Sequence, residues 1–344
     1  MTNRTKSILR KGLGFALALA WQSGASGCNA VKESEPPVTL AIAWTNTPES
    51  YSYTSTIVAA EETGANVVLL DQVKSYDLSY DSQEQLTGQK DAHGILSSSA
   101  AKRVKTNTWL NSNAEEVLQG VDCVIVPGGW DISPTLYYQE ETWHGIEEDG
   151  DYSAERDVSD YLLLSYCLDH DIPVFCICRG MQMLGVVSGA EMIQDIGTYF
   201  EEKGIAYSDL HRDPERKQFT AHAATITKTD SLLHQIMGTE VVEGCPSWHH
   251  QALKRVDDTR LVVTAVTETD GEAMIEAIER PDRSFCLGVQ YHPEVSVRKI
   301  IEQESDRESL MDYETAMKPF RALVEYCRKA LKTGDSVVLA LRTE

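Results

Sequence analysis

The chain has 344 residues, of which 42% are hydrophobic and 24% are charged, and this composition excludes both a disordered chain and a multi-span membrane protein. Thirty-one Lys and Arg residues against 53 Asp and Glu residues give a formal net charge of −22. Because proteins bind nucleic-acid phosphates through basic surfaces, this acidic balance argues against a nucleic-acid partner. The composition favours an enzyme for small molecules, and the length suffices for one large α/β domain.

Residues 1–27 have the pattern of an export signal. Basic residues without any acidic residue occupy positions 1–11, an apolar run follows at 12–21, and small or polar residues fill 22–27. Because this apolar run is too short to span a bilayer, the pattern is typical of a cleaved signal peptide. The alternative is an amphipathic helix at the start of a cytoplasmic protein.

A cysteine follows this signal. Residues 25–28, Ala-Ser-Gly-Cys, resemble the lipobox of bacterial lipoproteins, in which Cys28 would be lipidated and become the mature N-terminus. We therefore expect an exported protein, either anchored to a membrane through Cys28 or periplasmic, with 28–37 as a short tether. We expect no other contact with a membrane.

Residues 38–344 are predicted to form one α/β domain. Four runs rich in Val and Ile are typical of buried parallel strands; they are 38–44, 65–70, 121–126 and 173–177. A helix is predicted over 153–169, where apolar residues follow helical spacing and Ser153 is suited to be the N-cap. The segment 75–113 is expected to be a polar insertion.

The second half of this domain has a different pattern. Apolar and polar residues alternate there as in exposed or half-buried strands, over 225–227, 261–266, 273–278 and 285–290. An amphipathic helix over 318–331 is expected to close the domain.

The eight cysteines of the chain carry no disulfide or zinc pattern. With Cys28 lipidated, an odd number would remain, so they cannot all be paired. Most lie in apolar runs, where a thiol acts as a small buried hydrophobic group. A free thiol that is retained in an exported protein indicates a chemical role for that cysteine.

Cys178 lies at a predicted turn from a strand into a helix. The segment 173–184 runs from an apolar strand through Cys-Arg-Gly into an apolar helical pattern. This arrangement is typical of a nucleophile elbow, and the helix N-terminus favours the thiolate. We expect Cys176 to point to the opposite side, into the core. The alternative is that both thiols belong to the core.

His292 and Glu294 follow the last predicted strand, in the segment 288–294, Gly-Val-Gln-Tyr-His-Pro-Glu. A thiol nucleophile needs a base, for which histidine is the usual residue, and a carboxylate can orient that base. Because Pro293 disfavours helix, we expect both side chains on one side of an extended loop. The alternative is a surface turn.

A Pro-Gly-Gly turn follows the strand at 121–126. Glycines leave backbone N–H groups accessible, so this turn, Pro127-Gly128-Gly129, is suited to supply half of an oxyanion hole. The N–H group of Arg179 would be the other half. The alternative is an ordinary turn.

Together, these segments resemble the class I glutamine amidotransferase-like family, and within it the γ-glutamyl-γ-aminobutyrate hydrolase type. The resemblance runs from about Val38 to Glu294. Its motifs include residues 127–131, Glu155-Arg156-Asp157, 177–182, Gln194-Asp195-Ile196, His222, 247–252 and 288–294. Cys176 departs from the pattern, because it stands where the elbow of the family usually has glycine.

The resemblance implies a catalytic triad of Cys178, His292 and Glu294, with the backbone N–H groups of Gly129 and Arg179 as the oxyanion hole. We expect a flavodoxin-like three-layer α/β sandwich, with a mostly parallel sheet and antiparallel additions in the C-terminal half. The implied activity is hydrolysis of a γ-glutamyl amide through a thioester, without a cofactor.

Three polar residues are candidates for contacts with the glutamyl group: Gln182, Ser247 and Gln251. The alternative is that they bond to loop backbone. His249 and His250 are adjacent and could suggest a metal, but adjacent side chains in extended structure point apart. We therefore expect no metal site.

Two other functions are compatible with the same residues. One is a glutaminase subunit that supplies ammonia to a synthetase, although export argues against it because such partners and their ATP are cytoplasmic. The other is an inactive ligand-binding lipoprotein, which the crowded elbow at Cys176 supports. The favoured partner is a small γ-glutamyl substrate.

Overall fold

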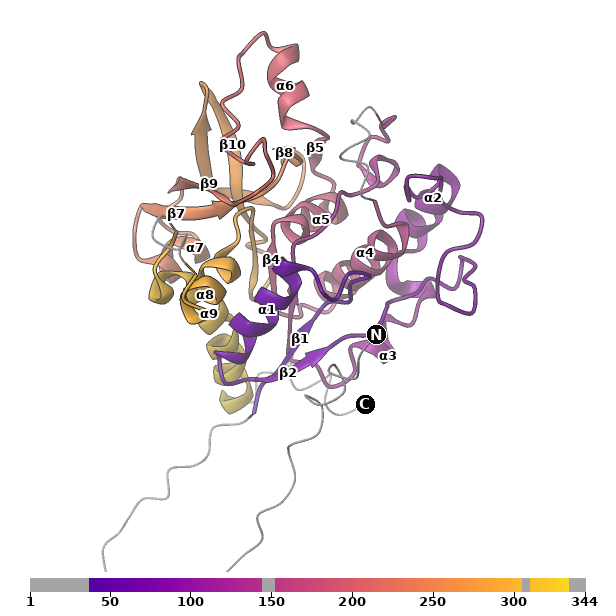
Figure 1. Cartoon of the computed structure of the whole chain (residues 1–344). Helices are drawn as coiled ribbons and strands as arrows, with labels where there is room; N and C mark the ends of the chain where they lie inside the picture. Colours follow the sequence, from indigo (N-terminus) through magenta and orange to yellow (C-terminus); the bar gives the residue numbers. More distant parts are fainter. Residues whose placement is uncertain (1–36, 144–151, 305–309, 334–344) are drawn as a thin grey trace, which may run out of the picture. The chain divides into compact units, whose positions relative to one another are not determined.

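The computed structural model describes residues 37–143, 152–304 and 310–333 (Figure 1). The predicted signal peptide, Cys28 and the tether up to residue 36 lie outside the described residues. Within the described ranges, no helix combines the length and apolar character needed to cross a membrane.

Parallel strands form one half of the main sheet. The strands β1 (Thr39–Ile42), β2 (Asn66–Leu69), β3 (Cys123–Val126), β4 (Val174–Ile177) and β11 (Cys286–Val289) follow the order β2-β1-β3-β4-β11, all in parallel pairs. This order is that of a flavodoxin-like doubly wound sheet, in which ligands bind beyond the carboxyl ends of the strands. The predicted strands are confirmed, although β2 is at the edge and only partly buried.

Antiparallel strands extend the sheet beyond β11. They follow the order β10 (Glu272–Glu279), β9 (Val262–Thr269), β6 (Thr220–Ile226) and β7 (Val241–Ser247). A separate pair joins β5 (Glu191–Ile193) to β8 (Ala252–Arg255). The expected antiparallel additions are therefore confirmed.

Helices cover both faces of the sheet (Figure 1). One face packs against α2 (Ser98–Asn107), α3 (Ala114–Val117), α4 (Ala154–Asp169) and α5 (Arg179–Ser188). The other face packs against α1 (Tyr51–Glu61), α7 (Leu232–Met237), α8 (Pro293–Ile301) and α9 (Tyr313–Thr333). A smaller cluster forms under α6 (Ile196–Glu202), and the short 3-10 turns are η1 (Thr108–Asn111) and η2 (Pro134–Leu136). The three-layer prediction is confirmed.

Helix α4 begins as the sequence indicates. The Oγ atom of Ser153 accepts a hydrogen bond from the Arg156 N–H group at 3.3 Å, which satisfies one of the N–H groups that a helix start leaves unpaired. The helix is buried almost all round, because the sheet lies on one side and the segment 75–113 lies on the other.

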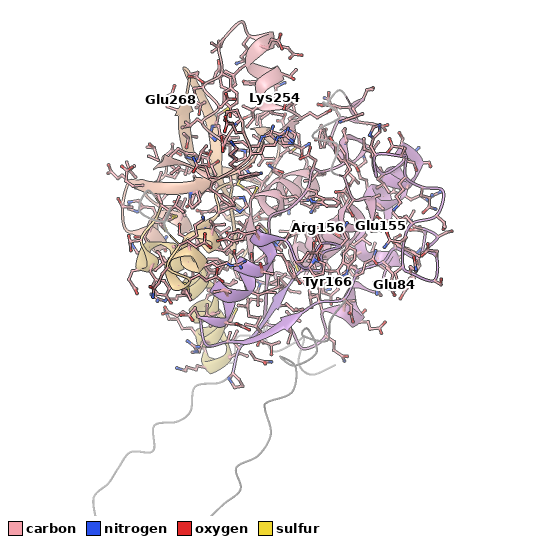
Figure 2. All side chains as sticks on the ribbon, in the orientation of Figure 1. Glu84, Glu155, Arg156, Tyr166, Lys254 and Glu268 are labelled. Carbon is pink, nitrogen blue, oxygen red and sulfur yellow. The ribbon has the colours of Figure 1, made fainter. Side chains whose placement is uncertain are left out.

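The segment 75–113 is therefore more than a polar insertion. Its apolar residues, among them Leu86, Leu96 and Val104, are buried in the same core as α4. The carboxylate of Glu155 on α4 accepts hydrogen bonds from the Leu86 N–H group at 2.8 Å and from Lys90 Nζ at 2.5 Å (Figure 2 labels Glu155). The sequence did not indicate this packing, because apolar residues are sparse in this polar segment.

Candidate active site

Cys178 occupies the turn between β4 and α5. Its backbone has φ of +50° and ψ of −109°, a conformation that costs energy for any residue with a side chain. A strained turn between a strand and a helix is typical of a nucleophile elbow, so the predicted turn is present. Gly180 permits it, because a Cβ atom there would overlap the backbone oxygen of Val126.

Cys176 points away from this turn. It is buried in the core on the α4 side of the sheet, whereas Cys178 belongs to the core on the other side. Burial raises the pKa of the Cys176 thiol well above its usual value, so this thiol stays protonated and unreactive. The predicted opposite orientation of the two cysteines is confirmed. It arises from the turn at Cys178, because alternation along a strand would place residues 176 and 178 on the same face. Every cysteine in the described ranges is buried and free of disulfides.

His292 and Glu294 lie beside the elbow, at the start of α8. The Nδ1 atom of His292 is 2.7 Å from Oε1 of Glu294, whose side chain is fully buried. The prediction of an extended loop was wrong, because Pro293 is the first residue of α8. Proline is well tolerated at that position, where its missing N–H group has no helical partner.

The structure brings His292 and Cys178 to the same point. A Cβ atom built on Gly128 would lie 2.8 Å from Cε1 of His292 and 3.5 Å from Cβ of Cys178, so both side chains adjoin this glycine. Burial alone would lower the pKa of His292, but the charges of Cys178 and Glu294 outweigh it and raise the pKa to about 10. The imidazole therefore carries a proton at neutral pH.

Two polar side chains near this pair were not predicted. Ser52 in α1 donates a hydrogen bond from Oγ to Glu294 Oε1 at 2.9 Å, and Gln290 donates from Nε2 to Cys178 Sγ at 3.4 Å. Gln290 lies within the segment 288–294, which offered a signal for it. Ser52 comes from the opposite end of the chain, and no pattern around it indicated a role.

Arg156 holds the Pro-Gly-Gly turn in place through hydrogen bonds to its backbone. This guanidinium donates from Nη2 to the carbonyl oxygens of Pro127 at 2.9 Å and Gly128 at 2.8 Å. Gly129 has φ of +152°, and a Cβ atom there would overlap Arg156 Nη1, so glycine is required. With its carbonyls directed at Arg156, the turn presents the Gly129 backbone to the cavity that contains Cys178.

Buried charges hold Arg156 and the first residue of α5 together. Arg179 donates from Nη2 to Asp157 Oδ1 at 2.6 Å and from Nη1 to Asp160, and Arg156 Nε reaches the same oxygen of Asp160 at 3.3 Å. All of these side chains are at most 2% exposed. Figure 2 labels Arg156, which belongs to α4. The resemblance included Arg156 and Asp157, but the sequence assigned them no role.

A cavity of about 230 Å³ opens at the elbow. Cys178, Gly129, Gln182 and Gln251 line it, and the loop that follows α6 adds Arg212 and Arg216. The N–H group of Arg179 is the first of α5, so no carbonyl within that helix can accept from it. The predicted nucleophile and both predicted oxyanion-hole residues are thus together at one end of the sheet.

The three candidates for substrate contact fall into two groups. Gln182 and Gln251 line the cavity, but Gln182 Nε2 already donates to the Gln251 carbonyl oxygen at 2.9 Å. Ser247 is fully buried and donates from Oγ to the backbone oxygen of His211 at 3.0 Å. For Ser247 the structure therefore agrees with the alternative, a residue that bonds to loop backbone.

His249 and His250 point in different directions, as expected. His250 lies between Asp131 at 2.9 Å and Asp195 at 3.1 Å. Burial opposes its protonation, but the hydrogen bond and charge of Asp131 raise the pKa of His250 to about 9. His249 turns instead toward His211, His222 and Glu276, a group of buried side chains next to the cavity that could hold a metal ion.

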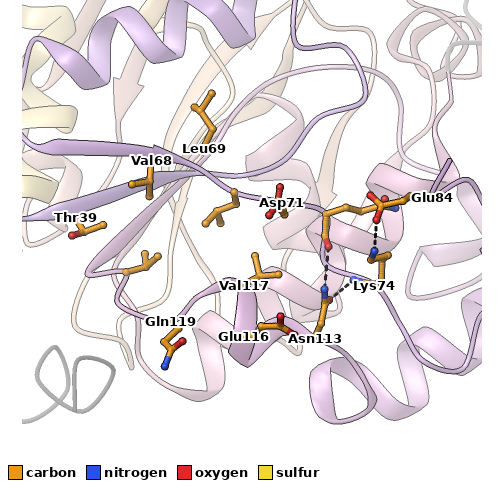
Figure 3. A pocket seen from close by; sticks show the side chains of 13 residues that line it. Thr39, Val68, Leu69, Asp71, Lys74, Glu84, Asn113, Glu116, Val117 and Gln119 are labelled. Carbon is orange, nitrogen blue, oxygen red and sulfur yellow. Dashed lines mark hydrogen bonds and ion pairs between the residues drawn. The ribbon is translucent and has the colours of Figure 1, made fainter. Parts of the chain in front are cut away.

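A larger cavity of about 580 Å³ lies at the β2 edge of the sheet (Figure 3). Val68, Asp71, Asn113 and Gln119 are among its lining residues. Figure 3 shows Lys74 paired with Glu84, at 2.6 Å, and the side chain of Asn113 bonded to backbone atoms of Gln72 and Lys74. It contains neither histidine nor cysteine in its lining, and none of the predicted site residues.

Comparison with known proteins identifies the family of this chain. The family model Peptidase C26 matches residues 102–294. "Protein NtpR" of Enterococcus hirae is 35% identical over 184 residues, which are 53% of this chain and 71% of that protein. "Gamma-glutamyl-gamma-aminobutyrate hydrolase PuuD" of Escherichia coli K12 is 29% identical over 181 residues, which are 52% of this chain and 66% of that protein.

Among solved structures, the chain is similar to the glutaminase domain of CTPS from Trypanosoma brucei, with a TM-score of 0.45 and 17% identity, over 85% of this chain and 94% of that one. The family assignment rests on the sequence comparisons, because the family model spans Cys178, His292 and Glu294. The chain belongs to the Peptidase C26 family of class I glutamine amidotransferase-like proteins, as its sequence motifs predicted.

Proposed function

We propose that this protein is a cysteine-dependent hydrolase that cleaves γ-glutamyl amide bonds through a thioester on Cys178. The observation that carries the proposal is the strained elbow at Cys178 beside His292, whose ring Glu294 holds at 2.7 Å. The similarity to the gamma-glutamyl-gamma-aminobutyrate hydrolase of Escherichia coli supports the substrate class.

The first half of the reaction forms the thioester. His292 holds the proton of Cys178, and the thiolate sulfur attacks the γ-carbonyl carbon, so that a C–S bond forms and the carbonyl oxygen becomes an oxyanion. The N–H groups of Gly129 and Arg179 stabilise that charge. Protonated His292 then donates its proton to the nitrogen, and the C–N bond breaks with release of the amine.

The second half releases glutamate. His292, now neutral, takes a proton from water, and the resulting hydroxide attacks the thioester carbon. The C–S bond breaks, and the sulfur leaves as a thiolate beside His292, which keeps the proton. Throughout, Glu294 keeps Nδ1 of His292 engaged, so that Nε2 is the nitrogen that exchanges protons with substrate and thiol.

The cavity suits a small acidic acyl group. Its volume of about 230 Å³ lies below the range of about 300–1,000 Å³ that is usual for drug-sized ligands, as a small acyl group requires, and Arg212 and Arg216 line it. Guanidinium groups bind carboxylates well, and a γ-glutamyl substrate has a free α-carboxylate beside its scissile bond. This chemistry favours a glutamyl group over an uncharged acyl group.

Glutamate release from four substrates tests the proposal. The protein is incubated under reducing conditions with γ-glutamyl-γ-aminobutyrate, a γ-glutamyl dipeptide, a folate polyglutamate and glutamine. We expect cleavage of at least one of the first three, and the ranking identifies the leaving group. Cleavage of glutamine alone would favour an ammonia donor with a partner synthetase. Cleavage of none would favour a ligand-binding protein.

We expect Glu294→Gln to move the alkaline limit of activity. Because protonated His292 delivers the proton to the leaving amine, kcat/KM of the unaltered protein should persist until pH approaches about 10 and fall above it. Glutamine at position 294 lacks the negative charge that stabilises the imidazolium, so the pKa of His292 should fall. The alkaline limb of the kcat/KM profile, where activity falls with rising pH, should therefore move to lower pH. The maximal kcat should also fall, by up to about 10⁴-fold.

Ser52→Ala is the matched control for this change. It removes the 2.9 Å hydrogen bond to Glu294 but keeps the carboxylate charge, so the alkaline limb should stay close to that of the unaltered protein. Profiles of kcat/KM between neutral pH and pH 11 measure the difference. An unchanged limb in Glu294→Gln would mean that this carboxylate does not stabilise the imidazolium.

A further inference from the structure

A second cluster of reactive side chains lies in the antiparallel half of the domain. His211 comes from the loop after α6, His222 from β6, His249 from the loop after β7, and Glu276 from β10. One nitrogen or oxygen atom from each lies within 4.8 Å of the others, and all four residues are buried. Such convergence of three imidazoles and a carboxylate is the composition of a transition-metal site.

The converging atoms have no hydrogen-bond partners among the described residues. They are Nδ1 of His211, Nε2 of His222, Nε2 of His249 and both carboxylate oxygens of Glu276. His211 Nδ1 lies 3.4 Å and His222 Nε2 lies 3.7 Å from Glu276 Oε1. Because buried polar atoms are nearly always hydrogen-bonded, several unpaired ones at a single point indicate a ligand between them.

Hydrogen bonds on the far side of each ring direct lone pairs into the cluster. His249 Nδ1 is 2.9 Å from the Gln251 carbonyl oxygen, which only accepts, so Nδ1 carries the hydrogen and Nε2 has the lone pair. Thr267 donates its hydroxyl hydrogen to the Ala223 carbonyl oxygen and therefore accepts from Nδ1 of His222 at 3.1 Å. This leaves the Nε2 lone pair of His222 directed inward as well.

The third imidazole is held in the same way. His211 Nε2 is 2.8 Å from the hydroxyl oxygen of Thr269, and its Nδ1 points at the carboxylate. Partners of this kind on the outer nitrogen are what orient metal-binding histidines. With the lone pairs of His222 and His249 beside a carboxylate, the centre of the cluster is rich in acceptors, which is the electrostatic environment of a cation.

We propose that His211, His222, His249 and Glu276 bind a divalent transition-metal ion, with Zn²⁺ as the best fit. Three nitrogen ligands and one oxygen ligand match the tetrahedral preference of zinc, with bonds of about 2.0–2.2 Å. That geometry places ligand atoms about 3.3–3.6 Å apart, and the 3.4 Å and 3.7 Å separations to Glu276 Oε1 are close to it. Oxygen-preferring Mg²⁺ and Ca²⁺ do not suit three imidazoles.

The site is structural rather than catalytic. Four protein ligands complete a tetrahedral shell and leave no position for water or substrate. Its ligands join segments that are distant in the sequence, and two of them border the catalytic cavity. His249 lines that cavity, and His211 directly precedes Arg212, which lines it as well. The ion would therefore fix the cavity wall, whether or not the proposed hydrolase activity is correct.

The sequence did not reveal this site, and the expectation of no metal rested on the adjacent pair His249 and His250. The ligands share no short spacing motif, since each comes from a different element. They meet only because β6 and β10 flank β9 in the sheet and place His222 and Glu276 near one another.

Metal content of the full chain, purified without an affinity tag, tests the proposal. Elemental analysis after gel filtration should give about one zinc per chain, and Zn²⁺ added to chelator-treated protein should restore it and raise the melting temperature. Glu276→Gln, which keeps the side-chain shape, should lower the affinity at least tenfold. His234→Ala is the matched control, because that histidine lies in α7, outside the cluster.

Cobalt substitution of the unaltered chain keeps the test valid if Glu276→Gln does not fold. Co²⁺ bound by three imidazoles and a carboxylate should give the intense visible absorption of a tetrahedral ion, without the sulfur-to-cobalt band that a cysteine ligand would add. Absence of both bound zinc and bound cobalt after reconstitution would overturn the proposal. Equal zinc affinity in Glu276→Gln and His234→Ala would also overturn it.

Discussion

Cys178→Ala should abolish release of glutamate from every γ-glutamyl substrate that the unaltered protein cleaves. The substitution removes the sulfur that would form the thioester, while the cavity and the oxyanion-hole donors remain. Loss of a catalytic nucleophile costs roughly 10⁴- to 10⁶-fold in kcat. Steady-state assays under reducing conditions measure the loss, and circular dichroism confirms that the variant is folded.

Cys176→Ala is the matched control, since it alters a thiol only two residues away. Cys176 is buried on the opposite face of the sheet, so its removal should leave kcat/KM within about twofold and cost about 1 kcal/mol of stability. Retained turnover in Cys178→Ala would remove the thiol from the mechanism. Loss of activity in both variants to the same extent would indicate a structural effect on the elbow.

Arg156→Met should be the most damaging change that touches neither the nucleophile nor its base. It leaves the carbonyl oxygens of Pro127 and Gly128 without their donor, and it removes one partner of the buried Asp160. Breaking a buried ion pair costs about 3–5 kcal/mol of unfolding free energy. Because the Gly129 turn loses its support, kcat should also fall by about 10²- to 10³-fold.

Arg255→Met is the control for removal of an arginine. Arg255 pairs with Glu191 at the surface and is 52% exposed, so its loss should cost less than about 1 kcal/mol and leave kcat unchanged. Urea denaturation of both variants measures the difference in unfolding free energy. Equal stability of the two would mean that the buried network contributes no more than a surface ion pair.

Local sequence patterns predicted most of the fold and the centre of the site. Short apolar runs specified the parallel strands, because burial on both faces of a sheet leaves little freedom in composition. The elbow at Cys178 was predictable because the turn, the glycine at 180 and the following helix are contiguous. Ser153 likewise identified the start of α4 through its ability to cap.

Local sequence patterns could not predict interactions between segments that are distant in the sequence. Pro293 was interpreted as excluding helix, but its effect depends on its place in the element, and at the first helical position it is favourable. Arg156 and Asp160 are charged residues in a helix, which usually indicates a solvated face, yet both are buried, Arg156 against the turn at 127–128 and Asp160 against Arg179 of α5. The contact of Ser52 with Glu294 joins α1 to α8, and only the assembled sheet brings those helices together.

Trapping the covalent intermediate is the most direct test of the central claim. The protein is mixed with an activated γ-glutamyl anilide, quenched in acid within the first turnovers, and analysed by intact-mass and peptide mass spectrometry. Formation of a thioester on Cys178 should give a mass increase of one glutamyl group, located on the peptide that contains Cys178 and absent from Cys178→Ala. Turnover without any adduct, or an adduct on another residue, would contradict it.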